Sequence, residues 1–599
     1  MNRRVIVTPL WLAALTALGW AAVAHAQWSA CGVPLVTNSA NQYLPAAVSD
    51  NAGGTIVAWA DQRTKTATGT ARWMIYAQRL DLLGMPQWAI DGIQVAPDTA
   101  VADSVFDQEY PAALADGSGG AYIAWVDKHS YPSTDLYMQH IDANGVPAWA
   151  TSDGGLVVSR ATYAQQSPTL IQDGAGGVIV VWQSSIGNNF DIYAQRLDAS
   201  GTLQWGAGGV PVCTRPNGQF RPRGITDGVG GAIIVWYDER FIIGGFGGQD
   251  IFAQKLNGAG APQWTLNGVA VYGSVSSGFT GDQRNPEIIS DGAGGAIITC
   301  EDAHGVAGCA NPCPSDRMFD ISAQRLDATG AQQWTVNGST VCLSNFDQKA
   351  PNLCTDGAGG AFIAWHDYRK GGNVDADVYA QRLNPLGVSQ WTANGVPLIT
   401  LAGHQLYPNI VSDGANGAIV TWYDERGVTP NLFAQRLNPA GAALWTANGV
   451  GICGTPYGLY AHSTIADGLG GAIIAWQDGR TTNTDIYAAR VNGSGGLGAP
   501  VVVLGVEYTS AGGLVLGAPS PNPTRRAMTV RFVLPSAAPA ALELIDVSGR
   551  LVEAHEVGGL GPGAHVLQLG RESAPHAGLY LVRLRQNGRS LIGKVSVVP

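Results

Sequence analysis

The chain has 599 residues, of which 80 are glycine and 13% are charged, and its formal net charge is −11. Residues 519–599 hold nine Arg and Lys against five Asp and Glu, so the preceding region, without the two arginines near the N-terminus, carries −17. Such a surface repels phosphate backbones, which argues against nucleic acid as a partner.

Residues 1–26 are predicted to be a secretory signal peptide. Arg3 and Arg4 form a basic start, an apolar run follows, and residues 24–26 are a small-x-small cleavage site. The apolar run is also long enough for an uncleaved anchor, which is the alternative. No later segment is apolar enough to span a membrane. We therefore expect an exported protein, extracellular or at the outer-membrane surface, without a transmembrane segment in the mature chain.

A repeat occurs eight times within residues 27–500. Its copies begin at Asp50, Asp116, Asp173, Asp227, Asp291, Asp356, Asp413 and Asp467. Nine residues after each Asp comes a Trp, replaced once by Cys300, and seven copies carry a second Trp after a DIYAQRL-like segment. Self-similarity of this regularity is stronger evidence than any single motif.

Each copy is predicted to form four short strands. A strand with a Pro leads to a DGxGG turn, whose glycines suit a tight hairpin. An apolar run such as AIIVW follows, then the alternating DIYAQRL, then a turn into a fourth strand, QWTANGVPV. Four-stranded sheets repeated about a centre indicate an all-β fold, an eight-bladed β-propeller. An open β-solenoid is the alternative, but no capping element is evident.

The ends of the repeat region favour a closed ring. The eighth copy lacks the second Trp, and the segment from Gln27 and Trp28 matches the segment from Gln204 and Trp205. We therefore expect the N-terminal strand to complete the last blade. Residues 501–504 are the competing strand.

Eight cysteines in an exported protein make disulfides possible. Cys309 and Cys313 share one loop and could pair, whereas Cys213, Cys342 and Cys453 occupy one repeat position and are kept apart by it. The connectivity is otherwise open. No Cys/His spacing suggests zinc. The DGxGG turn precedes a strand, where a phosphate loop needs a helix, and it lacks EF-hand ligands. We expect no metal and no cofactor.

Residues 501–518 are predicted to be a linker, and residues 519–599 a small immunoglobulin-like β-sandwich. This last region has no Trp or Cys, and it contains short alternating strands separated by turn signals such as Asn587-Gly588.

The strings PNP, VRFVLP, LELIDVSGRLV, GLYLVRL and KVSVV in residues 521–598 carry a family resemblance. The region resembles the C-terminal sorting domains of the type IX (Por) secretion pathway and the related flagellar-hook-scaffold Ig-like domain. The resemblance implies passage across the outer membrane, with residues 519–599 contacting the secretion machinery. A plain Ig-like module without sorting activity is the alternative. The repeat region resembles exported bacterial propeller repeats of unassigned activity.

Loop lengths vary on only one face of the expected propeller, where binding sites usually lie. We predict Trp73, Tyr131, Phe241 and Phe246, aromatic residues in irregular loops of that face, as ligand-binding candidates. A glutamine recurs eight residues before the Asp in seven copies: Gln42, Gln108, Gln165, Gln219, Gln283, Gln348 and Gln405. Gln108 and Gln283 are further candidates at the channel mouth. The competing interpretation, amides that tie inner strands to their neighbours, is favoured by the symmetry.

An Asp-x-Arg pair follows the first Trp in five copies: Asp61/Arg63, Asp238/Arg240, Asp367/Arg369, Asp424/Arg426 and Asp478/Arg480. A glycosidase needs two carboxylates at a defined separation, but pairs that recur so evenly are better explained as ion pairs that hold loops. The breaks at Ser184, His129 and His304 form no triad. His129, His304 and His366 share the face, without spacing that indicates a metal site.

The sequence therefore favours an exported recognition or structural propeller, with an extracellular glycan or protein as its ligand and no evident catalytic residue. The alternative is a hydrolase or lyase that acts on polysaccharide with carboxylates of the variable face. A surface-layer component is a third possibility that the sequence does not separate from the first.

Overall fold

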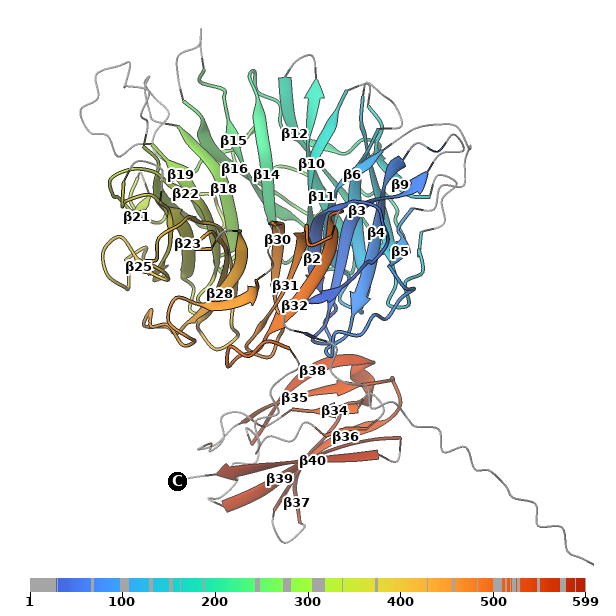
Figure 1. Cartoon of the computed structure of the whole chain (residues 1–599). Helices are drawn as coiled ribbons and strands as arrows, with labels where there is room; N and C mark the ends of the chain where they lie inside the picture. Colours follow the sequence, from blue (N-terminus) through green and yellow to red (C-terminus); the bar gives the residue numbers. More distant parts are fainter. Residues whose placement is uncertain are drawn as a thin grey trace, which may run out of the picture.

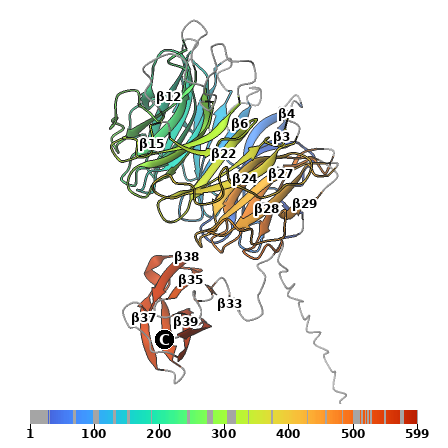
Figure 2. The same ribbon diagram turned by 90° about the vertical axis from the view of Figure 1, so that its left-hand side faces the viewer.

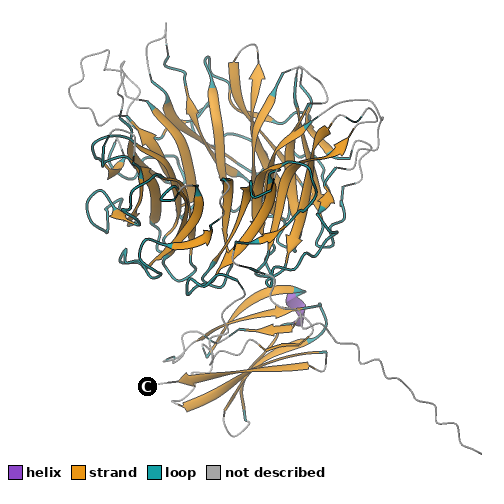
Figure 3. Cartoon of the chain, in the orientation of Figure 1, coloured by secondary structure: helices purple, strands orange, loops and turns teal. Residues whose placement is uncertain are grey.

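In the computed structural model, the described residues form almost only β-strands and loops, and the one helical element among them is the 3-10 turn η1 (Gly558–Leu560) (Figure 3). The structure describes residues 28–29, 31–65, 69, 71–96, 107–128, 133–149, 154–161, 163–186, 189–242, 248–272, 282–303, 318–336, 338–371, 375–427, 429–454, 458–481, 483–498, 509–511, 514–517, 519, 524, 528–546, 550–570, 578–587 and 589–597. The predicted signal peptide, Tyr131, Phe246, Cys309, Cys313 and residues 501–504 lie outside the described residues. Within them, no helix is long and apolar enough to cross a membrane.

Eight four-stranded antiparallel sheets correspond to the eight repeats (Figure 1). The first four are β2 (Gln42–Ser49), β3 (Thr55–Lys65), β4 (Ala71–Leu80) and β5 (Ile93–Gln94); β6 (Gln108–Ala115), β7 (Ala121–Asp127), β8 (Asp135–Ile141) and β9 (Leu156–Ser159); β10 (Gln165–Gln172), β11 (Val178–Ile186), β12 (Asn189–Leu197) and β13 (Val210–Cys213); and β14 (Gln219–Thr226), β15 (Ala232–Asp238), β16 (Asp250–Leu256) and β17 (Val269–Ala270).

The second four sheets repeat this order, except that the last one takes its outer strand from the N-terminus. They are β18 (Gln283–Ser290), β19 (Ala296–Asp302), β20 (Asp320–Leu326) and β21 (Ser339–Cys342); β22 (Gln348–Thr355), β23 (Ala361–Asp367), β24 (Asp377–Leu383) and β25 (Val396–Pro397); β26 (Gln405–Ser412), β27 (Ala418–Asp424), β28 (Asn431–Leu437) and β29 (Val450–Cys453); and β30 (Leu459–Ala466), β31 (Ala472–Asp478), β32 (Asp485–Val491) and β1 (Val33–Pro34).

The row of sheets closes on itself in a propeller-like ring. The first strand of each sheet packs against the first strand of the next, and β30 packs against β2. The pairing of β1 with β32, with Val33 opposite Ala488, matches the predicted N-terminal closure.

The second strand of each sheet is buried on both faces, as its apolar run predicts. The first Trp of the repeat is at most 1% exposed in all seven copies that have it, and each one packs into a core shared by neighbouring sheets. The fourth strand is shorter than predicted. It begins after the second Trp, which instead precedes the strand in an irregular segment.

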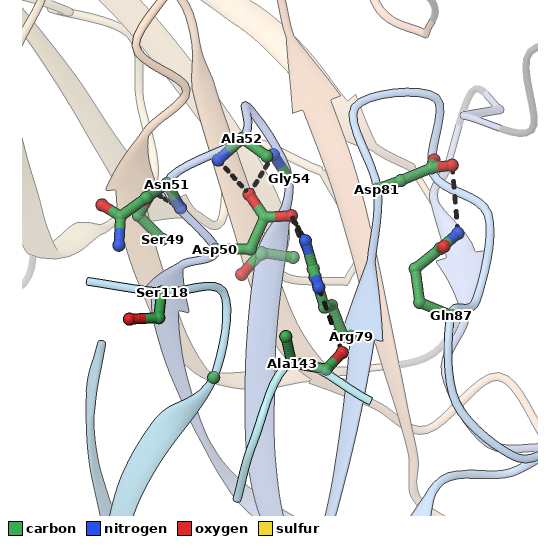
Figure 4. Close-up of polar contacts among 12 residues, drawn as sticks. Ser49, Asp50, Asn51, Ala52, Gly54, Arg79, Asp81, Gln87, Ser118 and Ala143 are labelled. Atoms are coloured by element: carbon green, nitrogen blue, oxygen red, sulfur yellow. Dashed lines mark hydrogen bonds and ion pairs between the residues drawn. The ribbon is translucent and has the colours of Figure 1, made fainter. Parts of the chain in front are cut away.

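The DGxGG turn is organised by its aspartate, as Figure 4 shows for the first sheet. Asp50 Oδ1 accepts hydrogen bonds from the backbone N–H groups of Ala52 (2.8 Å) and Gly54 (2.7 Å). A Cβ at Gly54 would lie 2.1 Å from the Leu80 carbonyl oxygen, so this position requires glycine. The other carboxylate oxygen, Oδ2, accepts from Arg79, and Arg79 Nη1 donates to the carbonyl oxygen of Ala143 in the next sheet (3.1 Å).

The second Trp of each repeat joins neighbouring sheets. Its indole Nε1 donates to a backbone carbonyl oxygen in the turn between the third and fourth strands of the next sheet, at 2.9–3.2 Å. The eight pairs are Trp28–Leu82, Trp88–Ala143, Trp149–Ala199, Trp205–Gly258, Trp264–Ala328, Trp334–Pro385, Trp391–Pro439 and Trp445–Gly493. Trp28 thus supplies the contact that the eighth copy lacks.

The remaining two sheets enclose a core of their own (Figure 2). They are β33 (Thr509–Ala511), β34 (Leu514–Leu516), β35 (Met528–Leu534) and β38 (Gly563–Leu569), and β37 (Leu551–Glu556), β36 (Ala540–Asp546), β39 (Gly578–Gln586) and β40 (Arg589–Val597). β33 and β34 lie within residues 501–518, the predicted linker, and they pair with strands of this unit. Phe532 and Val566 of this unit line a small cavity with Leu82 and Leu469, two turn residues of the ring.

Candidate functional site

A β-bulge interrupts the first strand in all eight sheets of the ring. One extra residue opposes the second strand near the start of each first strand. The residue two positions after the strand begins has a positive φ of 41–57° in every copy although none is glycine: Leu44, Tyr110, Ser167, Arg221, Asn285, Ala350, Tyr407 and Ala461. Backbone in this region is strained for such side chains, and strain of this kind concentrates at functional sites.

Five of these bulge residues line one cavity of about 910 Å³: Arg221, Asn285, Ala350, Tyr407 and Ala461. The cavity, which we call the channel cavity, lies along the inner strands of the fourth to eighth sheets, at the strand end opposite the DGxGG turns. The residue after the first Trp, or after Cys300 in the fifth sheet, forms a second layer of the wall in three sheets, with Glu301, His366 and Tyr423. Identity varies at both positions, whereas the framework around them is constant.

The second layer supports the bulges directly. Glu301 Oε1 accepts from the backbone N–H of Ala350 (2.8 Å), and His366 Nδ1 accepts from that of Tyr407 (3.4 Å). Glu301 also accepts from Arg284 Nε (2.8 Å) and Asn285 Nδ2 (2.9 Å). Both oxygens of this carboxylate are therefore engaged, which leaves Glu301 as a structural anion.

An aromatic cluster forms one side of the channel cavity. The ring centroid of His366 lies 5.6 Å from that of Tyr368 and 5.6 Å from that of Tyr407. The ring centroid of Tyr423 lies 4.8 Å from that of His462. Burial lowers the pKa of His366 to about 3 and that of His462 to about 4, so both imidazoles are neutral at neutral pH. Burial also raises the pKa of Tyr423, which keeps its hydroxyl protonated. This side of the channel cavity therefore consists of uncharged aromatic rings with polar atoms at their edges.

Most charged groups in the channel cavity have a hydrogen-bonding partner, although the partner of Arg221 is a neutral amide. Glu287 accepts from Arg223 Nε (3.0 Å), and Arg221 Nη1 donates to Asn285 Oδ1 (2.6 Å). Among the described carboxylates of the wall, Glu425 is the one for which no side-chain partner is seen. The described part of the cavity thus lacks a pair of free carboxylates.

The two predicted aromatic candidates that the structure describes, Trp73 and Phe241, do not line this cavity. Trp73 lies in strand β4, and not in a loop as predicted, because β3 and β4 extend into a long hairpin. It packs partly buried against Tyr43, with ring centroids 4.8 Å apart. Phe241 packs against Phe252 at 6.3 Å in the core between the third and fourth sheets. Tyr131 and Phe246 lie outside the described residues.

The two glutamine candidates are buried and used by the framework. Gln108 Oε1 accepts from the backbone N–H of Ile75 (3.2 Å), and Gln283 Oε1 accepts from that of Ile251 (3.3 Å). Both bonds reach the preceding sheet. These two glutamines therefore tie neighbouring sheets, as the competing interpretation holds. In the other five copies the side-chain amide instead donates to the backbone carbonyl two residues earlier: Gln42, Gln165, Gln219, Gln348 and Gln405.

The five Asp-x-Arg pairs are ion pairs of 2.5–2.6 Å with fully buried carboxylates. In the fourth sheet, Asp238 also accepts from Trp236 Nε1 (2.7 Å), and the Arg240 guanidinium lies 3.6 Å above the Phe252 ring. Arg240 Nη2 donates to the carbonyl oxygen of Asn267 (2.8 Å). With every oxygen so occupied, these carboxylates hold the framework, as the repetition predicts.

The third sheet shows the effect of losing this pair. Ser184 replaces the aspartate, and Gln165 Oε1 accepts from Trp182 Nε1 instead (2.6 Å). A cavity of about 450 Å³ lies beside Trp182, Ser184 and Tyr193. Asp191, opposite Ser184 in the strand pair, has a pKa raised to about 6 by burial.

Metal ligands do not assemble in the described part of the chain, where no group of three His, Cys, Asp or Glu side chains could hold an ion. His366 lies in the channel cavity, and His129 and His304 are outside the described residues. The residue two positions after each repeated glutamine varies, but so do its neighbours in the strand, so no sequence signal marks this cavity.

No protein-family model and no curated protein matches the chain. Among solved structures, the chain is similar to a protein of unknown function from Dyadobacter fermentans (12% identity, 54% of this chain and 92% of that chain, TM-score 0.32). It is also similar to the GH93 α-L-arabinofuranosidase of Fusarium graminearum (12%, 55% and 93%, TM-score 0.31) and to an endo-arabinase from Bacteroides thetaiotaomicron (12%, 43% and 88%, TM-score 0.23). At this level of similarity nothing about activity follows from the matches.

Proposed function

We propose that the protein is an exported, eight-bladed β-propeller that binds an extracellular glycan in the channel cavity without cleaving it. The observation that carries the proposal is the set of bulge residues, because they put one side chain from each of five sheets into one cavity of about 910 Å³. Eight four-stranded sheets with a closed row of inner strands support the blade number.

The chemistry of the wall favours a neutral polar ligand. Tyr368, Tyr407 and Tyr423 combine apolar ring faces with hydroxyl groups, and Asn285 and Asn409 add amides that donate and accept. Sugars present apolar faces bordered by hydroxyl groups, so aromatic rings beside amides suit them. An anionic or cationic ligand would compete with the ion pairs Arg284–Glu301 and Arg223–Glu287.

Binding is favoured over hydrolysis because two of the three described carboxylates of the cavity are engaged, which leaves Glu425 without a second free carboxylate. A glycosidase of the usual kind needs one carboxylic acid and one carboxylate separated by about 5–10 Å. Glu301 and Glu287 are paired with arginines. A hydrolase or lyase stays the second candidate, and incubation with each bound polysaccharide followed by an assay for new chain ends separates the two.

The remaining parts of the proposal concern export. Two four-stranded sheets around one core support an immunoglobulin-like unit at the C-terminus. We propose that residues 519–599 contact a type IX secretion apparatus and that the mature protein is released or held at the cell surface. The DGxGG side of the ring carries the contact with this unit, which leaves the channel cavity on the opposite side.

The test is a glycan array probed with the mature chain, residues 27–599, and two variants. Tyr407→Ala removes a cavity ring, and Ala350 and Ala461 indicate that alanine is accepted at this backbone position. We expect at least about tenfold weaker binding, near 1.4 kcal/mol. Tyr110→Ala is the matched control, since Tyr110 is a bulge residue of similar exposure outside the cavity, and it should bind like the parent. Equal losses in both variants, or no glycan bound by the parent, would refute the proposal.

A further inference from the structure

The ring closes at a place where two cysteines meet. Cys31 precedes β1, the strand that completes the last sheet, and Cys453 ends β29 of the seventh sheet. The Cys31 thiol lies within hydrogen-bonding reach of the Cys453 thiol, and the N–H of Gly454 donates to Cys31 Sγ (3.3 Å). Arg480 Nη2 contacts both residues, at 2.9 Å from the Cys31 carbonyl oxygen and 3.5 Å from Cys453 Sγ.

The other sheets show that Cys31 occupies a position built for asparagine. Asn267 Oδ1 accepts from the N–H that follows Cys213, and Asn394 Oδ1 accepts from the N–H that follows Cys342, both at 3.0 Å. Cys31 Sγ makes the same contact after Cys453.

The backbone at this position also favours asparagine. The φ angle is 65° at Asn267 and Asn394 and 69° at Cys31, in the left-handed region that asparagine tolerates better than most side chains. Cysteine is therefore less suitable than asparagine at this position. It nevertheless occurs in the copy that the N-terminal segment contributes to the last sheet.

We propose that Cys31 and Cys453 form a disulfide bond that locks the N-terminal segment into the ring of the exported protein. The bond would close a loop of more than four hundred residues between the two cysteines, and cross-links over long loops restrict the unfolded chain most. The proposal rests on the export proposed above, because disulfides persist in oxidising compartments.

The chemistry requires a disulfide-bearing oxidant, such as an envelope thiol oxidoreductase or, in vitro, oxidised glutathione. The half-buried Cys31 thiolate attacks the oxidant, forms a mixed disulfide and releases one thiolate. Cys453 then loses its proton and attacks the Cys31 sulfur, which releases the second thiolate. Two protons leave the protein, and two electrons pass to the oxidant. Burial raises the pKa of Cys453, which lowers the fraction of thiolate available for this second step.

Mass spectrometry of the mature full chain tests the proposal. Protein secreted with its own signal peptide is denatured in iodoacetamide and digested without reductant. We expect a peptide that joins Cys31 to Cys453 and a melting temperature several degrees above that of Cys31→Asn, with the difference lost in dithiothreitol. Alkylation of both cysteines would overturn the proposal.

Two variants test whether the arrangement of these two positions determines which cysteines are linked. Cys342→Ser should leave the linked peptide unchanged, because Cys342 faces Asn394. Asn394→Cys should create a second link, to Cys342, by the same arrangement. A chain purified from a reducing cytoplasm and treated with oxidised glutathione separates pairing from export. A disulfide that forms in this purified chain but is absent from the secreted protein would refute export as the cause of the linkage. Neither result depends on glycan binding.

Discussion

Trp28 Nε1 donates a hydrogen bond of 2.9 Å to the Leu82 carbonyl oxygen, and this bond fastens the outer strand of the last sheet to the first sheet. The same carbonyl oxygen lies 3.5 Å from Arg490 Nη1 of the last sheet. The seven internal copies of the Trp contact join sheets that the chain already connects. Only this one joins the two ends of the ring.

Deletion of residues 27–37 should therefore lower the melting temperature far more than removal of residues 1–26. The deletion removes β1 and the buried Trp28 ring, and it leaves β32 as an unpaired edge strand that is prone to association. Calorimetry and light scattering on both truncated chains measure the two effects. An unchanged melting curve would show that the N-terminal segment is not part of the closure.

Trp236→Ala should reduce the free energy of unfolding by about 3–5 kcal/mol. Trp236 has no exposed surface, and its indole donates to Asp238, which would lose that donor while staying buried. Urea denaturation followed by circular dichroism gives the value. Val229→Ala in a turn of the same sheet, where the side chain is 81% exposed, should change it by less than about 0.5 kcal/mol. Equal effects of the two substitutions would contradict the burial of Trp236.

Asp320→Asn should stabilise the protein at pH 8 and have little effect near pH 4. Burial raises the pKa of Asp320 from 3.8 to about 7, so between these pH values the folded state binds more protons than the unfolded state. Stability then falls as pH rises through this range, and the uncharged asparagine avoids the loss. Its Oδ1 can still accept the Ser344 N–H. Melting temperatures from pH 4 to pH 8 measure the difference, which should widen with pH.

His366→Asn should flatten the acid side of the stability profile. The pKa of His366 falls from 6.5 to about 3 on folding, so the unfolded state binds more protons between these values and stability decreases as pH falls below about 6.5. The melting temperature of the variant should drop less than that of the parent between pH 7 and pH 5. Parallel curves would mean that His366 is not held neutral by its surroundings.

The repeats, the buried Trp and the N-terminal closure could be predicted from the sequence, because each depends on residues that recur at fixed positions of the repeat. It also favoured the correct interpretation of Asp238 and Arg240, since an ion pair that recurs in five sheets serves the fold. The pairing of β33 and β34 with the C-terminal sheet could not be predicted, because they are short strands without an alternating pattern.

The channel cavity could not be predicted in the same way. The local sequence around Tyr407 or Arg221 does not indicate a bulge. Glycine and asparagine, the residues that usually mark a positive φ, are absent from most copies of this position. The bulge is a product of packing between sheets, in which side chains such as Glu301 accept the displaced N–H of the neighbouring strand. Trp73 was misplaced for a related reason, because hairpin length is set by pairing between β3 and β4.

Each bulge combines a backbone conformation that the ring must keep with a side chain that can change. Its backbone is held by the neighbouring sheet, and its side chain is free to differ, as the series from Leu44 to Ala461 illustrates. Single substitutions at the five of these positions that line the channel cavity should therefore alter selectivity while leaving assembly intact. Such a surface can diversify among descendants of one gene, and it offers a ready scaffold for libraries of designed receptors.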